Sequence, residues 1–179
     1  MKKRGIVSVL IVVALSATLI YAQSNFSKLK ALLTGQEEVP VVSTTGSGTF
    51  NAIISKDETQ ITYELSYSNL ESNATQAHIH LGQPNVNGGI QVWLCSNLAS
   101  PPTPPGVQPC PLRSGTITGT ITGDNIVGPL SQGITTGELD ELIEAIRDGN
   151  TYVNVHTVNS PGGEIRSQIG PDGKGHGNH

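Results

Sequence analysis

Apolar and polar residues alternate along much of the chain, which predicts β-strands with one buried face. The pattern is clearest over residues 60–68 (QITYELSYS), where every second position is apolar. This period of two is typical of a half-buried strand. A second strand is predicted over 48–55, and the polar residues 56–59 between the two segments predict a hairpin.

Further segments that alternate, or that are rich in Thr, Val and Ile, are also predicted as strands. They are residues 75–81, 90–94, 115–122, 151–157 and 164–169. Turn-forming residues separate them, most densely at 82–89. Short strands joined by short turns favour a mainly β fold, an antiparallel β-sandwich of the Ig-like, Greek-key type.

A single apolar stripe with helical spacing interrupts these strands. Its members lie at i, i+3, i+4 and i+7: Leu139, Leu142, Ile143 and Ile146. Thr135 and Glu138 have the spacing of a capping box, and Gly149 suits the end of a helix. We therefore predict one short α-helix near 137–148 that covers one end or edge of the sheets.

The N-terminal residues have the pattern of a secretory signal peptide. Three basic residues at 2–4 precede an uncharged, mostly apolar stretch at 5–22 that ends in Ala22. We expect residues 1–22 to be cleaved; the alternative is an uncleaved membrane anchor, for which the apolar stretch is just long enough. Both alternatives predict an exported protein, secreted or held at the cell surface.

Composition limits what the exported part can bind. Residues 23–169 are predicted to form a single domain, and the Gly- and His-containing tail, residues 170–179, is expected to be disordered.

The formal net charge is −4, so the basic surface of a nucleic-acid-binding protein is absent. The expected partner is an extracellular protein or a cell-surface ligand that the sequence does not identify, and a membrane only if residues 5–22 remain as an anchor.

Cys95 and Cys110 are the only cysteines, and in an exported chain they predict one disulfide. The segment between them is rich in proline, which disfavours a regular strand or helix there. The bridge would stabilise the fold by about 3 kcal/mol through loop closure. Two free thiols or a partial metal site are the alternatives, but the chain has no Cys-x-x-Cys motif.

Four sequence blocks in a fixed order carry a family resemblance. They are residues 32–40 (LLTGQEEVP), 77–82 (AHIHLG), 152–157 (YVNVHT) and 163–169 (GEIRSQI). Together they make residues 28–169 resemble the CHRD domain, a module named after chordin. The family usually has proline where this chain has Val41, and glycine where it has Ser167.

The CHRD resemblance implies an exported, β-rich module and no known chemistry. In chordin such modules belong to an extracellular protein that binds growth-factor ligands. This chain lacks a cysteine-rich companion domain, so we infer no growth-factor role. The expected function is a non-catalytic extracellular binding or structural module.

Polar residues on three predicted strands form the candidate site. His78 and His80 lie two apart on one strand, so they project from the same face with Cα atoms about 6.5–7 Å apart. A hairpin between the last two predicted strands brings His156 close to the polar residues that follow. The remaining members of the predicted site are expected to support these histidines: Asn154, Glu164 and Arg166.

Two interpretations of these histidines remain open. They could belong to a buried polar network that fixes strand register, provided that every member is hydrogen bonded. Alternatively, His78, His80 and His156 could bind one Cu or Zn ion, since imidazole suits both metals. A metal is not required as a cofactor in the first interpretation, and a mononuclear Cu/Zn-binding protein is the alternative function.

Catalysis is not expected at this site. The strand Ala77–His80 is similar to the copper-ligand strand of Cu/Zn superoxide dismutase, but only the tail residues His176 and His179 are left to build a second metal site. Dismutase activity is therefore not predicted. The chain also lacks the Gly-x-Ser-x-Gly elbow of many hydrolases. Asn25 and Asn73 match the N-glycosylation acceptor pattern and predict accessible positions.

Overall fold

Nine strands form one antiparallel sheet in the computed structural model, which describes residues 28–100 and 102–171. The order of strands across the sheet is β5-β4-β7-β8-β1-β2-β3-β6, and β9 pairs with β1. The bounds are β1 Lys28–Thr34, β2 Ser47–Ile54, β3 Ile61–Ser68, β4 Ala74–Leu81, β5 Gly89–Ser96, β6 Gly115–Ile121, β7 Thr151–Thr157, β8 Ile165–Gln168 and β9 Gly170–Pro171. The predicted signal segment, Asn25 and residues 172–179 lie outside the described residues.

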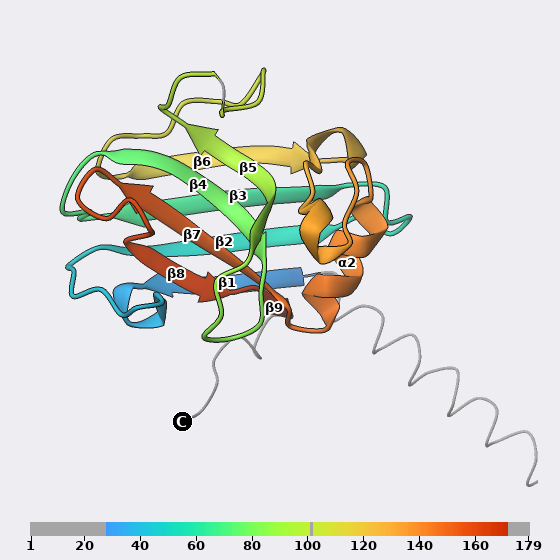
Figure 1. The fold of residues 1–179 in the computed structure, drawn as a ribbon, viewed down its shortest axis with the longest axis horizontal. Coiled ribbons are helices and arrows are strands. Elements are labelled where there is room, and N and C mark those ends of the chain that lie inside the picture. The colour runs from blue at the N-terminus through green and yellow to red at the C-terminus, as the bar shows by residue number, and fades with distance from the viewer. Residues whose placement is uncertain (1–27, 101, 172–179) are drawn as a thin grey trace, which may run out of the picture.

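This single curved sheet corrects the predicted Ig-like sandwich. The sheet does not divide into two packed layers, because β1 pairs with β2 on one side and with β8 and β9 on the other. Backbone pairing through β1 therefore joins the two halves of the sheet, which curls into a nearly closed barrel around the apolar core (Figure 1). The mainly β, antiparallel character of the prediction is confirmed.

Side chains and loops connect the two edge strands, β5 and β6. An isolated antiparallel bridge joins Val92 to Ile126, just beyond β6. The Gln108 side-chain amide donates to the carbonyls of Leu94, at 3.2 Å, and Thr118, at 3.1 Å. These contacts replace part of the main-chain ladder that a fully closed barrel would have.

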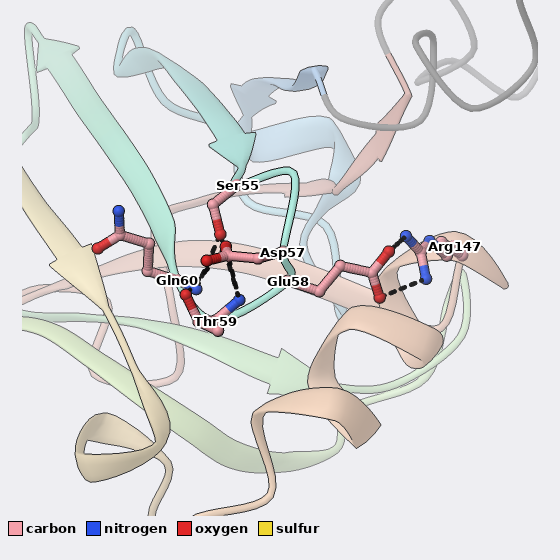
Figure 2. Close-up of polar contacts among 6 residues, drawn as sticks. All are labelled: Ser55, Asp57, Glu58, Thr59, Gln60 and Arg147. Atoms are coloured by element: carbon pink, nitrogen blue, oxygen red, sulfur yellow. Dashed lines mark hydrogen bonds and ion pairs between the residues drawn. The ribbon is translucent and has the colours of Figure 1, made fainter. Parts of the chain in front are cut away.

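The predicted hairpin at residues 56–59 is present between β2 and β3. Its polar residues satisfy the turn: Asp57 accepts a hydrogen bond from the Thr59 hydroxyl at 3.0 Å, and the Ser55 hydroxyl accepts from the Gln60 amide at 3.1 Å (Figure 2). At the same turn Glu58 forms an ion pair with Arg147 at the end of the helix. The polar side chains of this turn therefore stabilise the hairpin and its contact with the helix.

The single predicted α-helix is α2, Leu139–Arg147, and it lies at one end of the sheet (Figure 1). All four residues of the apolar stripe are buried. Only half of the predicted capping box is formed, because the Glu138 carboxylate accepts from the Thr135 amide while Glu138 itself is the N-cap. Gly149 has φ of 73° just after the helix, as expected for a C-terminal glycine.

Two strands were not predicted from the alternation pattern. β1 lies in a region whose only sequence signal is its family resemblance, and β9 consists of Gly170 and Pro171, which were predicted to belong to the disordered tail. Backbone pairing of Lys30 with Gly170 holds these residues against β1, although they contribute little apolar surface. The sheet therefore extends to Pro171.

The predicted disulfide between Cys95 and Cys110 is formed, with both sulfur atoms buried. It ties the proline-rich segment to the end of β5. Among the described residues, no helix is both long enough and apolar enough to cross a membrane.

Candidate functional site

His78, His80 and His156 converge on the face of the sheet opposite the apolar core, and we call them the histidine cluster. Core residues Ala77 and Ile79 alternate with the two histidines of β4, so His78 and His80 project from the other face. β7 lies beside β4 and supplies His156. One ring nitrogen from each histidine lies within 4.8 Å of the others, and the three residues are only 1%, 7% and 7% exposed.

Irregular pairing between β4 and β5 occurs at this site. The register shifts between Ala77 and His78, and again between Ile79 and His80. Such bulges re-aim the side chains next to them and are frequent near functional sites. The local backbone therefore departs from regular pairing at both histidines of the strand.

Backbone carbonyls fix the protonated nitrogen of two rings. The Nδ1 atom of His80 lies 2.9 Å from the Gly88 carbonyl, and the Nδ1 atom of His156 lies 2.9 Å from the Pro161 carbonyl. A carbonyl can only accept a hydrogen bond, so Nδ1 carries the hydrogen in both rings. In the neutral imidazole this leaves Nε2 of His80 and of His156 with a free lone pair.

The other ring nitrogens of the cluster are incompletely paired. Nδ1 of His78 lies 3.3 Å from Nε2 of His156, which is also 3.1 Å from the amide oxygen of Asn154. Nε2 of His78 and Nε2 of His80 are buried and have no hydrogen-bond partner among the described residues. Native buried polar atoms are usually paired, so two such nitrogens in one cluster call for a physical explanation.

Aromatic rings enclose the cluster. The Trp93 ring meets His78 edge to face, with centroids 4.3 Å apart, and the Tyr152 ring stacks on His80 at 4.7 Å. The guanidinium carbon of Arg166 lies 3.4 Å from the centroid of Tyr152. Arg166, Tyr152 and His80 therefore form one stack, with a fixed positive charge at its outer end.

Arg166 also holds the loop between β4 and β5. Its guanidinium donates to the Asn87 side chain at 3.0 Å and to the Val86 carbonyl at 2.9 Å. Gly88, which follows Asn87, accepts a hydrogen bond from His80 through its carbonyl and donates one from its backbone amide to the Tyr152 hydroxyl. A Cβ atom on Gly88 would lie 1.6 Å from the Leu81 carbonyl oxygen, so only glycine fits here.

Burial keeps these histidines neutral. Desolvation, followed by repulsion from His156 and His80, lowers the pKa of His78 to about 2. Desolvation also lowers the pKa of His80 to about 4, although the hydrogen bond to Gly88 acts in the opposite direction. The pKa of His156 is lowered for the same reason, against the hydrogen bond to Pro161. At neutral pH the lone pairs are therefore free of protons.

The predicted supporting residues divide into two groups. Asn154 lies beside His156, and Arg166 reaches the cluster through Tyr152. Glu164 lies in a separate polar cluster. Its carboxylate accepts from the hydroxyls of Thr44 and Thr157, each at 2.7 Å, and from the Glu71 backbone amide at 2.8 Å.

Several residues of the site were not identified from the sequence. Trp93 was not among the predicted site residues, and the residue types of Gly88 and Pro161 carry no signal for the role of their carbonyls. Glu38 is also buried near Arg166; desolvation raises its pKa to about 7, and Arg166 opposes this shift. The only sequence signal for Glu38 is its place in the block at 32–40.

Of the two predicted glycosylation positions, Asn73 lies within the described residues. It is exposed and directly precedes β4, away from the buried histidine rings. Its position is therefore accessible from solvent.

Comparison with known proteins gives one match. The family model of the CHRD domain matches residues 29–169, which is most of the chain and all of the strands except the first residue of β1 and the β9 pair. Neither the curated proteins nor the solved structures gave a match.

Proposed function

The chain belongs to the CHRD domain family, and from this premise we propose that it is an exported, non-catalytic module that binds one copper or zinc ion through His78, His80 and His156. The observation that carries the proposal is the convergence of three buried rings, with one nitrogen of each within 4.8 Å of the others and the lone pair of His80 Nε2 without a hydrogen-bond partner among the described residues. A bound metal ion would give such lone pairs the partner that the surrounding protein does not provide.

The alternative interpretation, a purely structural polar network, agrees less well with these contacts. Such a network stabilises a fold when every member is satisfied, and a partly satisfied network is worse than an apolar core. The carbonyls of Gly88 and Pro161 satisfy only the outer nitrogens of two rings. Nδ1 of His78 and Nε2 of His156 face one another, as two ligands of one metal ion do.

The geometry and the surroundings of the rings fit a metal centre. Two nitrogens bound to one ion at about 2.0–2.1 Å are about 3.3–3.6 Å apart. Nδ1 of His78 and Nε2 of His156 already have this spacing, at 3.3 Å, and one nitrogen of each of the three rings lies within 4.8 Å of the others. Metal-bound histidines usually donate their other N–H to a carbonyl or carboxylate, as His80 and His156 do here.

Export and the absence of catalysis are parts of the same proposal. The Cys95–Cys110 disulfide supports export, because disulfides persist mainly in oxidising compartments, and the pattern of residues 1–22 supports it independently. The near-complete burial of the three rings supports a binding role over catalysis, since a substrate would need access to the ion.

Metal binding can be tested on the full chain. We would first replace His176 and His179 by Asn, because tail histidines could bind metal by themselves. This background protein is expected to take up one equivalent of copper or zinc, measured by elemental analysis. Its thermal midpoint should rise with metal, since an ion at 100 times its Kd stabilises the folded state by about 2.7 kcal/mol.

The matched variant adds His80→Gln to the background protein. Glutamine keeps a polar side chain but removes a ring nitrogen, so uptake and the thermal shift should both be lost. Circular dichroism of the metal-free variant checks that it is folded. If the background protein takes up no metal, or if the folded His80→Gln variant takes up as much, the proposal is wrong.

A further inference from the structure

We infer that the histidine cluster selects monovalent copper, the cuprous ion, over divalent zinc or copper. This inference rests on the proposed metal site and adds the identity and charge of the ion. Imidazole serves both copper and zinc, so the type of ligand does not decide between them. Charge and coordination number do.

The ligands supply no negative charge. Within the described residues, the three histidines form this cluster without any carboxylate or thiolate. Cys95 and Cys110 are bound to each other and cannot contribute a thiolate. A fixed positive charge, the guanidinium of Arg166, stacks on Tyr152. An ion bound here keeps its full charge.

Keeping that charge is far more costly for a divalent ion. The solvation cost of a buried ion rises with the square of its charge, so an uncompensated divalent ion costs about four times as much as a monovalent one. The rings are almost completely buried, and the aromatic side chains of Trp93 and Tyr152 lie against His78 and His80. Such surroundings screen the charge poorly.

The number of ligands points to the same ion. Structural zinc is almost always held by four protein ligands, a zinc ion with three protein ligands needs a water as its fourth, and divalent copper prefers a square-planar or tetragonal set. A cuprous ion has a filled d shell and is stable with two or three ligands. The cluster offers three imidazole nitrogens. The nearby amide oxygen of Asn154 could approach as a fourth ligand, but it is neutral and leaves the charge uncompensated.

The experiment compares the affinities of three ions for the full chain with His176 and His179 replaced by Asn. Cuprous ion is supplied anaerobically with ascorbate and competed against bicinchoninate. Zinc and cupric ions are competed against chromophoric chelators. Trp93, the only tryptophan, reports on occupancy next to His78 by its fluorescence. We expect the cuprous ion to bind at least about tenfold more tightly than zinc.

The outcomes separate this inference from the proposal on which it depends. Equal or tighter binding of zinc or cupric ion overturns the inference and leaves the metal site intact. Failure of all three ions to bind overturns both. X-ray absorption of the copper-loaded protein should give three nitrogen ligands, and a shell of four or more also contradicts the inference.

A charge-changing variant tests the cause of the selectivity. Asn154→Asp keeps the size of a side chain whose oxygen lies 3.1 Å from Nε2 of His156, and it adds one negative charge. The preference for cuprous ion over zinc should then fall by about tenfold or more. An unchanged preference in the folded variant would mean that charge does not select the ion. If Asn154→Asp does not fold, the affinities of the three ions for the unsubstituted cluster still test the inference.

Discussion

The histidine cluster on β4 and β7 and the cluster around Glu164, just before β8, differ in how completely they are paired. The Glu164 carboxylate is fully buried and accepts hydrogen bonds from two hydroxyls and one backbone amide. The histidine cluster is similarly buried but leaves nitrogens of His78 and His80 unpaired. On this difference in pairing we base the proposed structural role of Glu164 and the proposed binding role of the histidine cluster.

The Glu164 cluster connects distant parts of the chain. Thr44 belongs to the loop after β1, Glu71 follows β3, and Thr157 ends β7. One carboxylate therefore links three segments that are far apart in sequence. In the histidine cluster, two ring nitrogens, Nδ1 of His78 and Nε2 of His156, instead face one another.

The largest expected effect is at Glu164. Glu164→Ala leaves a buried backbone amide and two hydroxyls without their acceptor, so the free energy of unfolding should fall by about 3–5 kcal/mol. Urea unfolding at neutral pH measures this loss. Glu164→Gln, which keeps one acceptor oxygen and the shape, should lose less. A loss below about 1 kcal/mol for the alanine variant would contradict a structural role.

The second effect is a loss of stability at acid pH caused by the histidines. Their folded pKa values lie below the unfolded value, so the unfolded state binds more protons as the pH falls below about 6.5. For His80, with a folded pKa of about 4, the loss between pH 6.5 and 4 is about 3 kcal/mol. Urea unfolding at a series of pH values in metal-free buffer gives the slope.

Glu38 acts in the opposite direction over part of this range. Its folded pKa of about 7 is raised, so the folded state binds the extra proton and gains stability as the pH falls from 7 toward 4.5. The acid loss should therefore be steeper in Glu38→Gln than in the unsubstituted protein. A free energy of unfolding that stays constant from pH 6.5 to 4 in this variant would mean that the histidines are not desolvated.

The third effect is the loss of stability at an exposed ion pair outside both clusters, which can be compared with the loss at the buried Glu164. Glu58 and Arg147 lie 2.5 Å apart, with side chains 46% and 36% exposed (Figure 2). Glu58→Gln should reduce stability by about 0.2–1 kcal/mol, because solvent screens the pair. Thermal unfolding at low and high salt checks this, and the difference should shrink in high salt. A loss as large as that of Glu164→Ala would contradict this ranking.

The smallest effect is expected inside the histidine cluster itself. His78→Leu removes one buried nitrogen that has no partner and one that makes only a long, 3.3 Å contact with His156, and it fills a similar volume, so the metal-free free energy of unfolding should stay within about 1 kcal/mol. Metal uptake should nevertheless be lost. Urea unfolding and elemental analysis test both parts. A large loss of metal-free stability would mean that His78 is a structural residue like Glu164.

Local pattern was sufficient to predict most elements of the fold. Alternation identified seven of the described strands, and the apolar stripe identified α2. β1 was missed although Leu29, Ala31 and Leu33 alternate in it and are buried. The alternation covers only a few residues and follows an apolar N-terminal stretch, so it is a weak signal for a strand. The short strand β9 has no side-chain pattern to detect.

The candidate site was predicted in part. The spacing of His78 and His80 places both on one face of a strand, and that much follows from the sequence alone. Placing His156 beside them requires the pairing of Gln76 with His156 across β4 and β7. The separation of Glu164 from Arg166 depends on the loop that brings Thr44 to the Glu164 carboxylate. Pairing over such distances has no local signature.

The sequence by itself determined the period of each strand, the faces of the helix and the pair of histidines two residues apart, because these depend on neighbouring residues. Only the tertiary structure decided that the strands form one nearly closed sheet and that backbone carbonyls at Gly88 and Pro161 orient two of the rings. Every residue has a carbonyl group, so its residue type cannot reveal which side chain it will bind. That is settled when distant segments pack against one another.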